Sequence, residues 1–318
     1  MVKIKMIVKT EVVEGVKTLT VKEDLTEREA RMLKSTQLSR EQIPTILRED
    51  CDVFVLLENG DSKLLLKFRK KVLPDAKSQA MFDNVIKFAR NSTTTRGTLV
   101  STKGFKYGKS KGLRDMKINK AVKSNMFGFF DQLSPAQKYS MKMRNQNLPL
   151  GVRLCRFNRD FPDEYEKTIP LIQEINKWYK KLVPDKFALQ NKKAQETPYH
   201  IADTAFTTVT TNVNVQTSVH SDKGDDKEGF GNLTVVERGK YEGSETCLPR
   251  HGIGVDVRTN DVLFMDVHEF HGNLPMVPKS EGVERLSIVC YLRYRVWLKS
   301  KGLKKIETNW VNTRKILK

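Results

Sequence analysis

Residues 210–233, TTNVNVQTSVHSDKGDDKEGFGNL, contain a His and an Asp at a spacing that can hold a metal. The segment begins with a run rich in Thr, Val and Asn, which is typical of a β-strand, and then presents His220 and Asp222. Residues i and i+2 of an extended segment point to the same face, so we expect the imidazole and the carboxylate to leave the strand end together. Both are candidate metal ligands, and a metal centre needs a further ligand from elsewhere.

That ligand is offered by residues 261–276, DVLFMDVHEFHGNLPM, where His268 and His271 follow a predicted strand. Two His and one carboxylate on one face of a metal form the facial triad of non-haem Fe(II) oxygenases, which leaves positions open for a co-substrate and O2. Spacing alone leaves both histidines as candidates. His200 and His251 have no ligand-like spacing and are interpreted as surface or hydrogen-bonded histidines.

An arginine on a later predicted strand indicates an anion close to these ligands. Arg285 lies 14 residues after His271 in ERLSIVCYLR, and Ser287 follows on the same face of the strand. An inward-facing arginine is costly to bury unless its charge meets an anion. We therefore expect Arg285 and Ser287 to bind the carboxylate of a co-substrate.

Three asparagines near the candidate ligands have two interpretations each. Asn212 and Asn214 lie on the face predicted to carry the ligands, so they either contact co-substrate or base or are sheet residues bound to backbone. Asn232 ends the GFGN run and either reaches the substrate or belongs to a tight hairpin entry. As site residues we assign Asn212 to the co-substrate, and Asn214 and Asn232 to catalysis or the substrate. Tyr291 and Tyr294 are interpreted as packing residues.

Several kinds of element must position these residues. Short β-rich runs between residues 201 and 296, separated by Gly, Asn and Pro turns, predict a sandwich or barrel. A hairpin is predicted at 52–70, where Asn59-Gly60-Asp61 separates two apolar runs. One or two short helices are predicted in residues 25–37 and 39–50, and further helices are predicted at 75–92 and 163–184.

The charge of the chain favours a polyanionic partner. The net charge is +19, but residues 101–150 carry a local +9, residues 201–300 a local −3 and the last 18 residues a local +5. A charge that served only solubility need not cluster in this way, so nucleic acid is the preferred interpretation. Residues 93–125 are rich in Lys and Gly and are predicted to form a long basic loop.

Other classes of protein are disfavoured. Apolar runs are strand-sized, and the N-terminus has no long apolar stretch of a signal peptide, so no membrane segment is expected. The four cysteines are scattered and are interpreted as buried reduced thiols. We expect a cytoplasmic or nuclear protein, with no obligate protein partner indicated.

Together, the segments TTNVNVQTSVHSDKGDDKEGFGNLTVVERGKYEG, LPRHGIGVDVRTNDVLFMDVHEFHGN and RLSIVCYLR resemble the TET/JBP group of Fe(II)- and 2-oxoglutarate-dependent dioxygenases. The resemblance covers about residues 150–296 and is nearest the branch found in algae and in large viruses or phages. It implies an α+β fold with a double-stranded β-helix (jelly roll, cupin-like) core at 146–297 and flanking helices. A basic α+β region would precede the core at 1–145, and a basic tail would follow it at 298–318.

The resemblance also implies an activity, namely oxidation of the 5-methyl group of 5-methylcytosine or thymine in DNA with O2. By position in the family motifs, iron would be bound by His220, Asp222 and His271, because His271-Gly272-Asn273 matches the HGN that contains the distal His of the family. Arg285 would bind 2-oxoglutarate. In the basic loop we expect DNA contacts from Lys103, Lys106, Lys109, Lys111 and Arg114.

Three alternatives stay open. Asp225 matches a residue implicated in an algal relative that uses ascorbate to modify 5-methylcytosine, so ascorbate is an alternative co-substrate. The same triad also serves prolyl and lysyl hydroxylases of proteins. A catalytically silent DNA-binding protein is the third alternative, although an intact set of ligands argues against it.

Overall fold

The computed structural model describes residues 6–93, 100, 122–132, 143 and 151–306. The five predicted DNA contacts, Lys103, Lys106, Lys109, Lys111 and Arg114, lie outside these residues. Among the described residues, no helix combines the length and the apolar character needed to span a membrane. All four cysteines are described and buried, as predicted.

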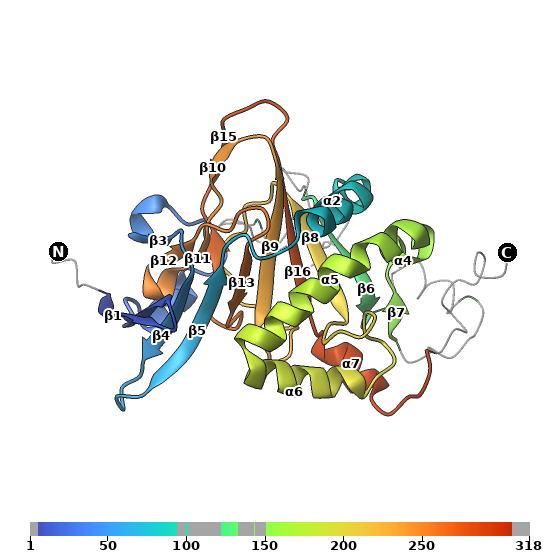
Figure 1. The fold of residues 1–318 in the computed structure, drawn as a ribbon, viewed down its shortest axis with the longest axis horizontal. Helices are drawn as coiled ribbons and strands as arrows, with labels where there is room; N and C mark the ends of the chain where they lie inside the picture. Colours follow the sequence, from blue (N-terminus) through green and yellow to red (C-terminus); the bar gives the residue numbers. More distant parts are fainter. Residues whose placement is uncertain (1–5, 94–99, 101–121, 133–142, 144–150, 307–318) are drawn as a thin grey trace.

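Ten strands of the described chain form one large mixed sheet (Figure 1). In spatial order these are β1 (Ile7–Val13), β2 (Val16–Val21), β4 (Cys51–Leu56), β5 (Ser62–Arg69), β13 (Val262–Met265), β9 (Gly231–Arg238), β16 (Glu284–Tyr291), β8 (Thr208–Val213), β6 (Ser124–Phe130) and β7 (Arg153–Leu154). The predicted hairpin is confirmed as β4 and β5, which pair antiparallel. β5 also pairs with β13, so strands from the N-terminal part extend the sheet of the core.

Two smaller sheets complete the β structure that is described. One contains β14 (Gly272–Asn273), β11 (Thr246–Leu248), β12 (Ile253–Val255) and β3 (Thr45–Leu47), and the other contains β10 (Tyr241–Gly243) and β15 (Met276–Pro278). Residues of the large sheet and of β11 and β14 line a common pocket. The expected α+β class with a double-stranded β-helix core is confirmed. The division at residues 145 and 297 stays a prediction, and β3, β5 and β6 show that strands from before residue 145 pair with strands of the core.

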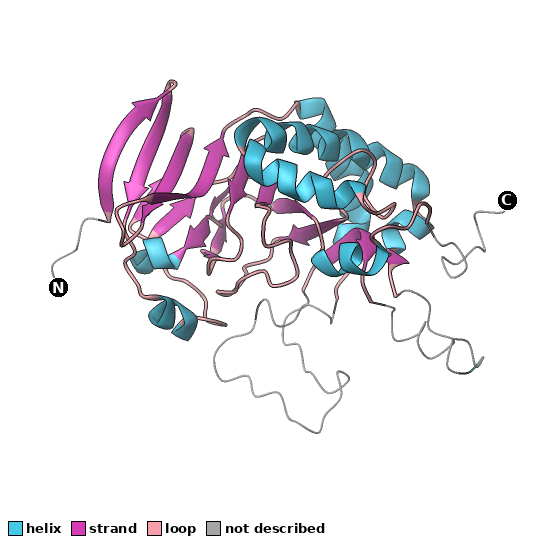
Figure 2. Cartoon of the chain, turned by 90° about the horizontal axis from the view of Figure 1, so that it is seen from below, coloured by secondary structure: helices cyan, strands magenta, loops and turns pink. Residues whose placement is uncertain are grey.

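The longer helices gather on one side of the large sheet, whereas loops and short helices lie on the opposite side (Figure 2). The described helices are α1 (Glu27–Met32), α2 (Asp75–Ala89), α4 (Arg156–Asp160), α5 (Pro162–Leu182), α6 (Pro184–Gln195) and α7 (Tyr294–Ser300), with 3-10 turns η1 (Arg40–Gln42) and η4 (Pro249–His251). The helices predicted at 75–92 and 163–184 are confirmed as α2 and α5. Of the one or two short helices predicted in residues 25–37 and 39–50, the first is confirmed as α1, whereas the second stretch forms η1 and then strand β3, which pairs with β12.

Strand β16 shows how the sheet separates the core from the pocket. Leu286, Ile288 and Cys290 belong to the apolar core that the sheet shares with α2 and α5. Arg285 and Ser287 alternate with them and line the pocket. Successive side chains of a strand point to opposite faces, so one strand serves both the core and the site.

Candidate metal centre and co-substrate pocket

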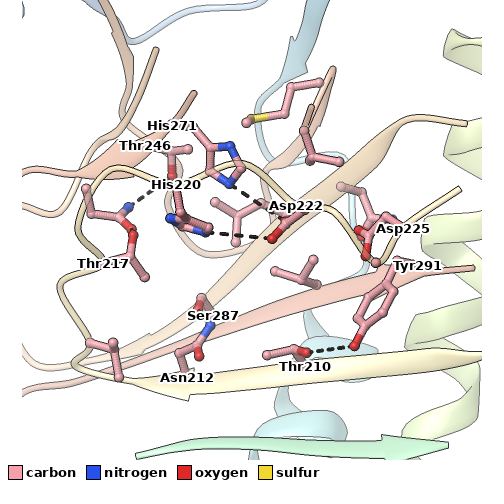
Figure 3. A pocket seen from close by; sticks show the side chains of 18 of the residues that line it. Thr210, Asn212, Thr217, His220, Asp222, Asp225, Thr246, His271, Ser287 and Tyr291 are labelled. Atoms are coloured by element: carbon pink, nitrogen blue, oxygen red, sulfur yellow. Dashed lines mark hydrogen bonds and ion pairs between the residues drawn. The ribbon is translucent and has the colours of Figure 1, made fainter. Parts of the chain in front are cut away.

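Three side chains converge in the pocket with the donor set of a metal centre. His220, Asp222 and His271 each offer one ligand atom, and these atoms lie within 4.8 Å of one another. Nε2 of His220 is 3.8 Å from one Asp222 oxygen, and Nε2 of His271 is 3.7 Å from the other. Figure 3 shows the two imidazoles and the carboxylate directed at a common point. The set fits a divalent metal that takes two imidazoles and a carboxylate on one face.

Backbone carbonyls fix the orientation of both imidazoles. Nδ1 of His220 lies 2.8 Å from the Ser218 carbonyl oxygen, and Nδ1 of His271 lies 2.9 Å from that of Glu269. Because a carbonyl oxygen can only accept, each Nδ1 must carry the proton, so the lone pair that can bind a metal is on Nε2.

The two ligand segments are also joined through their backbones. The N–H of His220 donates to the His271 carbonyl, and the N–H of His271 donates to that of His220, each at 2.8 Å. The N–H of Asp222 donates to the carbonyl oxygen of Val267 at 3.0 Å. The expectation that His220 lies at a strand end is wrong, because β8 ends at Val213 and His220 belongs to the irregular segment beyond it.

The second candidate histidine, His268, is directed elsewhere. Its Nε2 is 3.3 Å from the Asp226 carbonyl oxygen, and its N–H donates to the Asp266 carboxylate. Burial alone would raise the pKa of Asp266, but hydrogen bonds from Lys63 and from the His268 N–H hold that pKa below its ordinary value. The hydrogen bonds of His268 therefore stabilise the segment between β13 and His271. Of the two candidate histidines, His271 is the one that lies with His220 and Asp222.

An unneutralised cation faces the same pocket. Arg285 is 5 % exposed, and its Nε and Nη2 have no hydrogen-bond partner among the described residues. Ser287 lies beside it on β16 and accepts a hydrogen bond from Asn212 Nδ2 at 3.2 Å, while Asn212 Oδ1 has no partner in this part of the chain. A buried guanidinium with unsatisfied donors is suited to bind a carboxylate in the fork geometry of its N–H groups.

The pocket extends in both directions from the ligands and has a volume of about 250 Å³. Asp225 and Tyr291 lie on one side of Asp222, and Thr217 and Thr246 lie on the other side (Figure 3). Asp225 forms an isolated β-bridge with Arg293, which also lines the pocket and forms an ion pair with the buried Asp131. The pocket therefore has polar residues on both sides of the metal ligands.

Two of the predicted site asparagines use their amides on the backbone. Asn214 donates to the Val283 carbonyl and accepts from the Arg285 N–H, both at 2.7 Å, and it does not line the pocket. Asn232 lines the pocket, but its amide donates to the Cys290 carbonyl at 2.6 Å and accepts from the Cys290 N–H at 3.1 Å. Both amides support β16, so the structure does not offer them to a ligand.

Sequence reasoning missed several residues that line the pocket. Thr210, Thr217, Thr246 and Asn273 were not identified, and Tyr291 was interpreted as a packing residue. Asn273 is adjacent to a predicted ligand in HGN, and its Oδ1 accepts from the Thr217 hydroxyl at 2.6 Å. Alternation from Asn212 identifies Thr210, but no local pattern identifies Thr246, which comes from the opposite sheet.

A jelly-roll core with this donor set and a buried arginine defines the class of facial-triad oxygenases. Residues 139–294 match the family Tet_JBP, described as the oxygenase domain of the 2OGFeDO superfamily. This part of the chain is similar to the oxygenase domains of that family. The fold is similar to that of NgTET1, solved in complex with 5mC DNA, with a TM-score of 0.50, 12% identity and coverage of 90% of this chain and 97% of that one.

Curated relatives are longer than this chain. It is 32% identical to the thymine dioxygenase JBP1-B of Trypanosoma cruzi over 184 residues, which are 57% of this chain and 22% of the relative. It is 37% identical to the bifunctional helicase and thymine dioxygenase JBP2 of Leishmania infantum over 124 residues, which are 39% of this chain and 11% of the relative. The similarity therefore spans less than a quarter of the length of each of these relatives.

Proposed function

We propose that this protein is an Fe(II)- and 2-oxoglutarate-dependent dioxygenase that oxidises the 5-methyl group of thymine or 5-methylcytosine in DNA. The observation that carries the proposal is the buried guanidinium of Arg285 in the same pocket as His220, Asp222 and His271, with two nitrogen atoms that have no hydrogen-bond partner among the described residues. Iron bound by these three residues would supply O2 activation and oxidation of an unreactive C–H bond.

The residues of the pocket divide the remaining tasks. Arg285, with the Ser287 hydroxyl and the Asn212 amide, would bind the distal carboxylate of 2-oxoglutarate. The other end of the co-substrate would then be oriented toward the metal ligands. The opposite side, next to Asp225 and Tyr291, would receive the base. A base inside a duplex cannot reach this pocket, so the target nucleotide must be flipped out or lie in a single strand. The names of the relatives support DNA as the substrate, and a DNA substrate fits a cytoplasmic or nuclear location.

Nucleoside mass spectrometry tests the proposal. The full chain is incubated with Fe(II), O2 and DNA that contains thymine alone or thymine with 5-methylcytosine, as duplex or single strand. Parallel reactions contain 2-oxoglutarate, ascorbate or both, and a peptide mixture replaces DNA in a further set. We expect an oxidised 5-methylpyrimidine that requires 2-oxoglutarate.

Two matched variants complete the experiment. His271→Ala should abolish the product, whereas His268→Ala should retain most of it, because only His271 belongs to the ligand cluster. A product that forms with ascorbate alone would show that ascorbate, and not 2-oxoglutarate, is the co-substrate. Hydroxylated peptides with unmodified DNA would assign the chain to the protein hydroxylases.

A further inference from the structure

Each metal-ligating imidazole depends on a backbone carbonyl next to it in sequence, and both carbonyls lie in segments without long strands. Ser218 orients His220, and Glu269 orients His271. A shift of either segment would turn the imidazole away from the metal, because the hydrogen bond sets the direction of Nε2. What holds these two segments therefore decides the geometry of the site.

The segment of Ser218 and His220 is held by the chain that follows α1. The N–H of Ser35 donates to the Val219 carbonyl, and the N–H of Val219 donates to the Thr36 carbonyl, each at 2.8 Å. Val219 is buried, so these bonds are shielded from water. Val219, which makes these two hydrogen bonds, lies in the sequence between Ser218, whose carbonyl orients the imidazole, and the metal ligand His220.

The segment of Glu269 and His271 is held through an arginine. Nη1 of Arg250 is 3.4 Å from the Glu269 carboxylate, and Nη2 is 2.6 Å from that of Glu23. The Arg250 carbonyl also accepts the N–H of Asp24 at 2.7 Å. Arg250 thus links the carboxylate of Glu269, whose own carbonyl orients His271, to residues just before α1.

The start of the same segment is attached to β5. The N–H of Asp266 donates to the Leu65 carbonyl at 3.0 Å, and Lys63 Nζ is 2.7 Å from the Asp266 carboxylate. Three separate parts of residues 23–65 are therefore linked to the two ligand segments, two of them directly and one through Arg250. Apolar packing alone would be enough to attach the N-terminal region to the core. The polar contacts at Val219, Asp266 and Glu269 lie close in sequence to the ligands His220 and His271, which indicates a role at the metal site.

We propose that residues 23–65 act as a brace that fixes both metal-ligating imidazoles, with Glu269 and Arg250 as positioning residues. The inference rests on the metal-binding part of the proposed function. The mechanism is indirect, since neither side chain reaches the ligand atoms. Arg250 forms an ion pair with the Glu269 side chain, which restricts the position of the Glu269 backbone. The Glu269 carbonyl oxygen then accepts the hydrogen bond that orients the His271 ring.

The test compares two glutamates that differ in their relation to the site. Glu269→Gln weakens the link to Arg250, and Glu174→Gln weakens a matched ion pair with Lys77 between α2 and α5. The side chains are 18 % and 16 % exposed, respectively, so their burial is alike. Co(II) affinity and the Co(II) absorption spectrum are measured on the full chain, together with the melting temperature of the metal-free protein.

We expect Glu269→Gln to bind Co(II) about 10- to 100-fold more weakly and to alter the spectrum, as is usual when a residue that supports a ligand is changed. Glu174→Gln should bind Co(II) as the wild type does, even if both variants lose similar thermal stability. Arg250→Met should reproduce the effect of Glu269→Gln, and the double variant should lose less affinity than the two single losses combined, because both break one link.

Unchanged Co(II) affinity and spectrum in Glu269→Gln and Arg250→Met would overturn the inference while leaving the proposed function intact. A wild-type chain that does not bind Co(II) would overturn both. If Glu269→Gln does not fold, Glu23→Gln decides, since this carboxylate is 40 % exposed and tolerates substitution. Weaker Co(II) binding in that variant, by a smaller factor, supports the brace, and unchanged binding refutes it.

Discussion

At the scale of single residues, the buried charge of Arg285 indicates that the pocket binds an anion as well as a metal. Its side chain is buried, and two of its nitrogen atoms have no partner in the described chain, which is costly unless an anion binds there. The neighbouring Ser287 and Asn212 provide further polar atoms on the same face of the sheet. We therefore expect this arrangement to favour a small carboxylate over a neutral ligand.

Arg285→Lys keeps the charge but loses the planar fork of donors. The KM for 2-oxoglutarate should rise about 10- to 1,000-fold, which corresponds to a loss of about 1.5–4 kcal/mol of charge-assisted hydrogen bonding. Ser287→Ala should have a smaller effect in the same direction, because a neutral hydroxyl contributes less. Steady-state kinetics measure both, and Co(II) affinity serves as the control, since Arg285 is not a ligand. An unchanged KM would make Arg285 a structural residue.

At the scale of elements, the short turn η4 contains a buried histidine. His251 is 1 % exposed, and its Nε2 lies 3.9 Å from the Glu269 carboxylate. Burial, with the neighbouring Arg250 charge as the second cause, lowers the pKa of His251 from 6.5 to about 4. The turn therefore contains a neutral imidazole at neutral pH, and Arg250 is the cation beside Glu269.

This histidine should make stability depend on pH. Between pH 6.5 and 4 the unfolded chain protonates His251 while the folded chain does not, so its contribution is complete above pH 6.5 and is lost as the pH falls toward 4. The loss amounts to about 3 kcal/mol at one residue. Urea unfolding at several pH values should give a shallower pH dependence for His251→Gln than for the wild type. His200→Gln is the control, and an equal slope in all three proteins would contradict the prediction.

At the scale of the whole molecule, charge is distributed so that the pocket segment is acidic and the flanking segments are basic. Residues 201–300 carry a local −3, and residues 101–150 carry a local +9. Basic segments that are separate in sequence from an acidic site segment can hold phosphates without drawing them onto the metal ligands. Affinity for DNA and chemistry on the base are therefore expected to depend on different parts of the chain.

Removal of residues 103–123, which contain eight Lys and Arg, tests this separation. The Kd for DNA should rise, and its salt dependence should flatten by about 0.9 in log–log slope for each lost phosphate contact. Fluorescence anisotropy at several salt concentrations measures both. A second variant keeps the length and replaces only Lys103, Lys106, Lys109, Lys111 and Arg114 by Gln, which separates charge from chain length. Co(II) binding should stay unchanged in both, and unaltered DNA affinity would refute the assignment.

The sequence by itself determined those features that depend on local pattern. The β4–β5 hairpin, helices α2 and α5 and the alternation along β16 follow from turn residues and from periods of 3.6 and 2. The types of residue in the candidate triad were predictable for the same reason, because His-x-Asp and HGN are short motifs.

Only the tertiary structure shows which residues far apart in the sequence contact one another. Asn214 and Asn232 have the spacing of site residues, yet their amides bind the backbone of β16, some 70 and 58 residues away. The attachment of Ser35, Arg250 and Leu65 to the ligand segments likewise has no local signature. Such contacts depend on the pairing of strands far apart in the chain, and any polar side chain of suitable length can take the place that the fold provides. Local pattern therefore specifies what an element can be, and long-range pairing specifies what its side chains meet.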